Sequence, residues 1–93
     1  MPQYMTIHRA PGLPQEAWAE NSVGVYKSQF AKFVQAHVNL TTGFIFTVFE
    51  ADSRERLIEA FEEFGFPFEE INEIQFSQNY DEMVGMLKHM GRI

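Results

Sequence analysis

The chain has 93 residues, of which 45% are hydrophobic and 22% charged, and its formal net charge is −6. This length predicts a single small domain, and the acidic balance argues against nucleic acid as a partner, since that needs clustered Lys and Arg. The absence of cysteine excludes disulfides and thiolate chemistry. No apolar run approaches the roughly 18 residues of a membrane span. The N-terminus shows no basic-then-apolar leader pattern, so we expect a cytoplasmic protein.

Phenylalanine is unusually frequent, with ten copies in this short chain. So many large rings are difficult to bury in one small core. A domain of this size also buries a limited share of its surface, so a partner subunit would add stability. We therefore expect part of the apolar area to lie in a subunit interface or to line a ligand cavity.

The first half of the chain predicts a strand, a helix and a β-hairpin. Residues 3–9 alternate as a strand, and Pro14 opens a helix that extends to about Gln29. Two further strands, over 30–40 and 44–49, are separated by a short turn and form the hairpin. The strand over 44–49 is apolar on both faces, which is typical of a central strand covered on both sides.

The second half predicts a helix, a strand and another helix. Asp52 or Ser53 caps a helix that ends at Gly65, and a strand follows over 71–76. The resulting order, β-α-β-β-α-β-α, predicts an α+β fold of the ferredoxin-like split β-α-β type (βαββαβ). The domain spans 1–93, with its core over 3–77 and an extra C-terminal helix at about 79–91.

Five short motifs are spread over residues 1–76, namely Met1–Tyr4, Pro11–Gly12, Phe33–Val38, Gly65–Pro67 and Ile71–Ile74. Together they resemble a family of small nickel-binding, ferredoxin-like proteins that is known as a domain of unknown function. The resemblance implies a homodimer joined through the sheets, as in the wider dimeric α/β-barrel group. The C-terminal helix lies outside it.

The histidines depart from that family's pattern. Family members carry one His late in the first strand and another midway along the second helix, where this chain has Arg9 and Ala60. His8 stands one place earlier, which turns it to the opposite face of the strand. The family's nickel ligands therefore do not carry over to this chain, and we assign neither a metal ligand nor a cofactor.

A polar strip on the first two strands is the main candidate site. The strip consists of five residues: Tyr4, Thr6, His8, Gln35 and His37. They are predicted to share the sheet face away from the helices and to form part of a pocket with apolar walls. The alternative is that they face solvent on a half-exposed sheet. Together with three aromatic residues, the candidate ligand-binding set is Tyr4, Thr6, His8, Trp18, Phe33, Gln35, His37 and Phe46.

Three functions fit these observations. The leading one is a homodimer that binds a small apolar or amphipathic molecule, between the sheet and the helices or inside the dimer barrel. The second is binding of nickel or another transition metal, although His8 and His37 would lie roughly 9–10 Å apart, too far for one ion. The third is a cofactor-independent monooxygenase or isomerase of the dimeric barrel group, with one of these histidines as base. Whether the protein is an enzyme stays open.

Two groups of apolar residues lie in the last third of the sequence. Phe61, Phe64, Phe66 and Phe68 bunch around the end of the second helix, a pattern more typical of a core or an interface than of a ligand site. Three methionines give the last helix an adaptable apolar surface. We expect that helix to pack on a partner subunit or to close one end of the barrel, with or without exchange between subunits.

Overall fold

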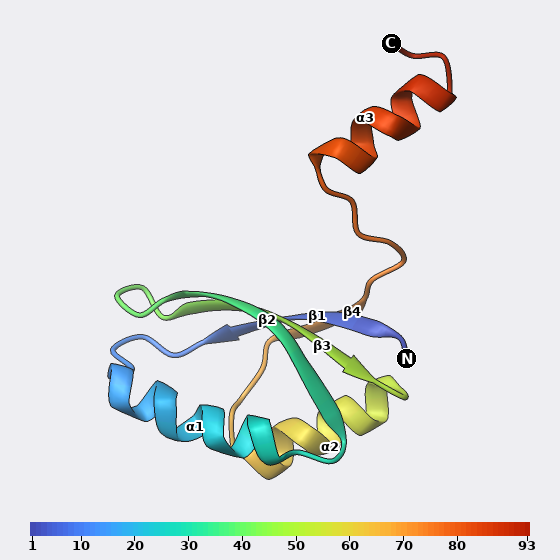
Figure 1. Cartoon of the computed structure of the whole chain (residues 1–93). Helices are drawn as coiled ribbons and strands as arrows, with labels where there is room; N and C mark the ends of the chain where they lie inside the picture. Colours follow the sequence, from blue (N-terminus) through green and yellow to red (C-terminus); the bar gives the residue numbers. More distant parts are fainter.

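A four-stranded antiparallel sheet, with two helices on one of its faces, forms the body of the protein (Figure 1). The computed structural model describes residues 1–93. Its elements are β1 (Gln3–Arg9), α1 (Gln15–Lys27), β2 (Ala31–Asn39), β3 (Phe44–Ala51), α2 (Arg54–Phe64), β4 (Glu70–Glu73) and α3 (Tyr80–His89). The predicted α+β, ferredoxin-like order with an added C-terminal helix is confirmed.

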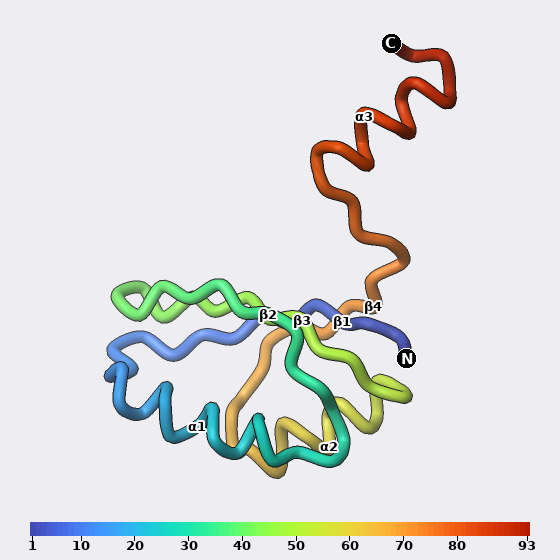
Figure 2. Tube along the Cα trace, viewed as in Figure 1, coloured from blue at the N-terminus to red at the C-terminus, as the bar shows by residue number.

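The sheet has the strand order β2-β3-β1-β4, so β3 and β1 are its central strands. α1 and α2 both lie on what we call the helix face, and the other side is the open face (Figure 2). Alternate residues of β1 are buried on the helix face, namely Tyr4, Thr6 and His8. Met5 and Ile7 point to the open face and are half-buried.

The two helices contribute unequally to the core. α2 begins at the cap Ser53, whose side chain accepts a hydrogen bond from the Arg56 amide at 3.2 Å. Its apolar stripe buries Leu57 and Phe61 against the sheet, where they join one hydrophobic cluster. α1 has no buried residue at all. The sheet is therefore tightly covered by α2 and loosely covered by α1.

The C-terminal part leaves the sheet earlier than predicted. β4 ends at Glu73 rather than at residue 76, and the Ile74 amide makes a last hydrogen bond to the Gln3 carbonyl at 2.8 Å. The chain then runs away from the sheet into α3, which packs on no other element (Figure 1). The radius of gyration is consequently 15.7 Å, against about 12 Å for a compact chain of this length. None of the helices has the length and apolar character needed to cross a membrane.

Candidate functional site

A cavity of about 420 Å³ lies between α1 and the helix face of the sheet. Ten of its lining residues are apolar: Trp18, Val25, Tyr26, Ala31, Phe33, Ile45, Phe49, Phe61, Phe64 and Phe66. The other six are polar: His8, Asn21, Ser22, Ser28, Lys32 and Thr47. This size and composition are those of small-molecule sites, which combine apolar walls with a few oriented polar groups.

The cavity follows from the sequence of α1 and the start of β2. Small side chains line it where larger ones would close it, notably Ser22 on α1 and Ala31 on β2. α1 packs against α2 and β2 without burying any residue of its own. Larger side chains from β3 and the end of α2 surround the gap, including Phe49 and Phe61. The result is a hollow with aromatic walls and one loosely held side.

His8 and Thr47 are the buried polar residues of this site, and His8 has only 1% of its surface exposed. Its imidazole packs edge-on against Phe61, with ring centroids 4.9 Å apart, and lies 5.1 Å from the Phe66 ring. Both contacts come from the end of α2 and the segment after it. The ring is therefore held in place by aromatic neighbours on one side and by the strands on the other.

Hydrogen bonds determine the tautomer of His8. Its Nδ1 lies 2.9 Å from the Pro67 carbonyl, which can only accept, so Nδ1 carries the proton. Its Nε2 then accepts from the Thr6 hydroxyl, 2.9 Å away, and Thr47 in turn hydrogen-bonds Thr6. Every buried side-chain nitrogen and oxygen has a partner. The imidazole thus has no free ring nitrogen in this arrangement.

Burial lowers the pKa of His8, because the surrounding apolar groups disfavour the charged ring, and the hydrogen bond to Pro67 opposes part of this effect. The ring is consequently neutral at neutral pH. Towards the cavity it acts as one more flat, uncharged wall. No carboxylate lines the cavity, and the one charged lining residue is Lys32. Lys32 lies opposite Glu50 in the β2–β3 register, between Ala31 and Phe33 of the helix face, so its side chain is directed to the open face.

The prediction that the polar strip forms a single surface is wrong, because its residues lie on both faces of the sheet. Tyr4, Thr6 and His8 point toward the helices, whereas Gln35 and His37 lie on the open face, where their side chains are 2.7 Å apart. A β-bulge between Phe33 and Gln35 is the cause on β2. One extra residue reverses the alternation, so Phe33 keeps to the helix face and the residues after it change sides.

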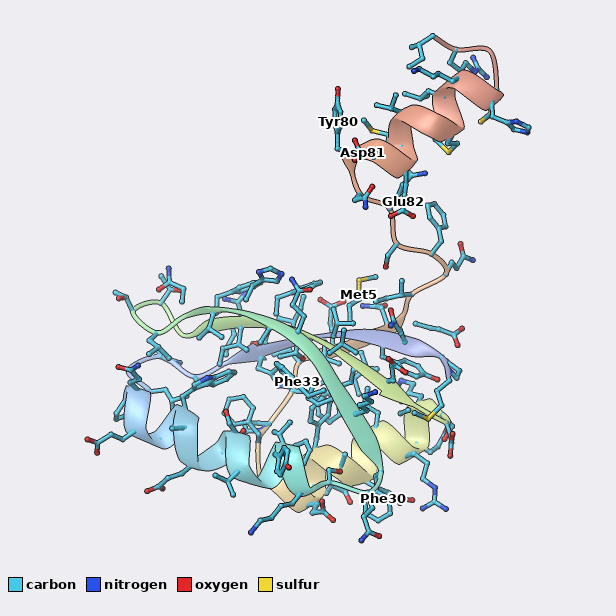
Figure 3. All side chains as sticks on the ribbon, viewed as in Figure 1. Met5, Phe30, Phe33, Tyr80, Asp81 and Glu82 are labelled. Atoms are coloured by element: carbon cyan, nitrogen blue, oxygen red, sulfur yellow. The ribbon has the colours of Figure 1, made fainter.

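The remaining candidates are placed as follows. His8, Trp18 and Phe33 line the cavity, and Figure 3 shows Phe33 on the helix side of the sheet. Tyr4 belongs to the hydrophobic cluster instead. Burial raises the pKa of its phenol, with smaller contributions from nearby carboxylates. Phe46 lies on the open face, paired with Ile7 of β1.

Several lining residues were not predicted as a site. The sequence pattern favours a core or interface role for Phe61, Phe64 and Phe66, whereas in the structure all three line the cavity and Phe61 also belongs to the core. The polar residues of α1, Asn21 and Ser22, carried no local motif. The available signal was the weak apolar pattern of residues 15–27, which fits a helix that does not pack closely.

A single chain does not bring together the side chains that a metal site needs. No three His, Cys, Asp or Glu side chains come close enough together to hold an ion. Arg9, at one position where the resemblance expects a histidine, forms an ion pair with Glu69 at 2.9 Å. Ala60, at the other, is fully buried in the core.

Comparison with known proteins gives two matches and one negative result. A family model described as nickel responsive protein SCO4226-like matches residues 4–74. The crystal structure of SCO4226 from Streptomyces coelicolor A3(2) superposes with a TM-score of 0.71 at 25% identity, covering 82% of this chain and 99% of that one. No protein of curated function matches. α3 lies beyond the part that the family model covers.

Proposed function

The chain belongs to the nickel responsive SCO4226-like family, and within that family we propose that it binds a small apolar or amphipathic molecule. The molecule would occupy the cavity between α1 and the sheet. The observation that supports this most directly is a space of about 420 Å³ with ten apolar lining residues. The cavity is partly open to solvent, so its aromatic walls stay in contact with water until an apolar ligand covers them.

The distribution of polar groups narrows the class of ligand. The neutral imidazole of His8 and the aromatic rings offer a flat apolar surface, which suits a planar or hydrocarbon group. No lining residue is acidic, and the one basic lining residue, Lys32, lies opposite Glu50 with its side chain directed to the open face. An uncharged aromatic or aliphatic group, with a polar end near Asn21 and Ser22, would therefore suit the site.

A cavity-filling substitution tests this proposal. Ser22→Phe on α1 adds a ring to the hollow and should weaken binding of the anionic dye 1-anilinonaphthalene-8-sulfonate at least tenfold. Trp18 is the single tryptophan of the chain and lines the cavity. Its quenching by the dye therefore reports binding directly.

Ala19→Phe is the matched control, because residue 19 lies on the exposed side of the same helix. It should leave dye binding unchanged, and thermal unfolding should show that both variants fold. A neutral analogue, N-phenyl-1-naphthylamine, separates charge from shape and should bind at least as tightly as the anionic dye, because no charged side chain is directed into the cavity. Equal binding by the wild type and Ser22→Phe would overturn the proposal.

Binding suits this geometry better than catalysis does. A general base needs a free lone pair near its substrate, and both ring nitrogens of His8 are engaged by protein groups. We also propose that the protein works as a homodimer. The half-buried apolar side chains of Met5, Ile7, Phe46 and Val48 on the open face support an association through that face.

Nickel is the ligand that the family's name suggests, and the donors of this chain do not fit it. His8 is buried and hydrogen-bonded, His37 is paired with Gln35, and His89 lies on the detached α3. We expect calorimetric titration of the untagged protein with Ni²⁺ at neutral pH to give only the heat of dilution. A saturable heat with a defined stoichiometry would contradict this expectation, and His37→Ala would then show whether the exposed imidazole is a ligand.

A further inference from the structure

The open face carries an apolar stripe along its two central strands. Met5 lies opposite Val48 and Ile7 lies opposite Phe46 in the β1–β3 register. Figure 3 shows Met5 on the side of the sheet away from α1 and α2. Polar residues on the outer strands border these four, namely Gln35, His37, Glu70 and Asn72. We call Met5, Ile7, Phe46 and Val48 the open-face stripe.

The stripe has the width of one helix. Neighbouring strands lie about 4.8 Å apart, so the side chains of two strands cover a band of roughly 10 Å. An α-helix with its side chains is about 10–12 Å across. The polar residues on either side would meet the polar flanks of such a helix. A single amphipathic helix therefore fits this surface better than a second flat sheet does.

One end of the stripe opens into a hollow of about 550 Å³. Met5, Phe46 and Val48 line it from the sheet, and the segment Ile74–Ser77 lines it from the chain that leads to α3. That segment is thus a wall of the hollow, and beyond it the chain turns outward (Figure 2). The chain's own helix follows this segment and extends away from the sheet (Figure 1).

α3 is an amphipathic helix without a partner in its own chain. Tyr80, Met83, Val84 and Leu87 follow the spacing i, i+3, i+4, i+7 and so share one side of the helix. Asn79 and Glu82 form a capping box at its start. An isolated helix of ten residues is marginal in water, because most helical stability in proteins comes from packing.

We propose that α3 of one copy lies on the open-face stripe of a second copy, in a symmetric dimer that exchanges its C-terminal helices. The two unpartnered apolar surfaces of the chain would then cover each other. Exchange is favoured over folding back, since the chain's own α3 would have to reverse around Ile74–Ser77 to reach the stripe. Methionine is well suited to this contact because its flexible side chain adapts to the pleated surface. The inference goes beyond ligand binding, as it concerns the opposite face of the sheet, and it rests on the homodimer proposed above.

The absence of cysteine allows a direct test by cross-linking. Val48→Cys and Met83→Cys are made in separate proteins, one of them isotopically labelled, then mixed and oxidised. We expect a disulfide between the labelled and the unlabelled chain, which mass spectrometry identifies by its mixed mass. Glu63→Cys, on the exposed side of α2, replaces Val48→Cys as the control and should give at least tenfold less product. If the double variant Val48→Cys/Met83→Cys closes within one chain instead, α3 folds back on its own sheet and the inference fails.

Light scattering on the full chain provides an independent readout. The wild type should have twice the chain mass of 10.8 kDa, and Leu87→Glu on the apolar side of α3 should shift it to the monomer. Gly85→Glu is the matched control, because residue 85 lies on the side of α3 opposite Leu87 and an added side chain there meets no atom of its own chain. It should keep the dimer. A monomeric wild type, or a dimer that is unaffected by Leu87→Glu, would overturn the inference, whatever the dye-binding experiment shows.

Discussion

Acidification from pH 7.5 to 5.5 should destabilise the protein through one buried side chain, His8. Burial lowers the pKa of His8 below its ordinary value of 6.5. Between the lowered pKa of His8 in the folded chain and its ordinary pKa of 6.5 in the unfolded chain, the unfolded chain binds a proton at this residue and the folded chain does not. Stability is therefore fully present above pH 6.5 and falls as the pH drops below it. The slope from one such group is at most about 1.4 kcal/mol per pH unit.

The variant His8→Asn separates this effect from the titration of other groups. An asparagine amide retains a donor for the Pro67 carbonyl but has no proton to gain in this pH range. We expect His8→Asn to lose about 2–3 kcal/mol at pH 7.5, because it removes part of a buried ring between Phe61 and Phe66. Between pH 7.5 and pH 5.5, the free energy of unfolding of His8→Asn should then fall distinctly less than that of the wild type.

Urea unfolding at pH 7.5, 6.5 and 5.5 provides the measurement, with His37→Asn as the control on the exposed sheet face. That control should keep the full acid sensitivity. If His8→Asn and the wild type lost equal stability over this range, the buried imidazole would not be the responsible group. The site would then be more hydrated than its hydrogen bonds indicate.

Gly43→Ala should destabilise the fold by about 3–5 kcal/mol, which is large for the addition of one methyl group. Gly43 is buried in the β2–β3 turn and has a φ of +79°, which disfavours a side chain. Its carbonyl accepts from the Ala10 amide at 2.8 Å. A Cβ at this position would overlap the backbone of Ala10 and Pro11. Backbone atoms cannot move aside as the end of a flexible side chain can.

Gly12→Ala is the control for backbone conformation alone. Gly12 has nearly the same φ, +78°, but a Cβ added to it would have no other atom within 4 Å. Its replacement should cost about 1 kcal/mol. Denaturant unfolding of both variants measures the difference. Equal costs would show that the hairpin turn can move away from the end of β1, and that their close approach adds no stability.

Local patterns were sufficient to predict the elements. The alternation over residues 3–9 corresponds to β1, the cap at Ser53 and the stripe through Leu57 and Phe61 correspond to α2, and the spacing from Tyr80 onward corresponds to α3. Strand and helix periods, caps and breakers act over a few neighbouring residues. The least accurate bound was the end of β4, because strand length there depends on how far β1 extends as its partner.

The candidate site was predicted only in part. The sequence predicts His8, Trp18 and Phe33 as site residues, and these three line the cavity. It also predicts Gln35 and His37 on the same surface, but they lie on the other side of the sheet. A single bulged residue decides this, and its position depends on how β2 pairs with β3. The cavity itself arises because α1 and β2 carry small side chains at positions that meet in space but are separated along the chain.

Length, composition and hydrophobic period thus determined by themselves the acidic character, the α+β class and the added C-terminal helix, because these properties are local or additive. The tertiary structure alone decided which strand faces meet the helices, where the gap remains and that α3 lacks a partner in its own chain. Each of these depends on the pairing of residues far apart in sequence, and a one-residue shift in pairing moves every following side chain of a strand to the opposite face.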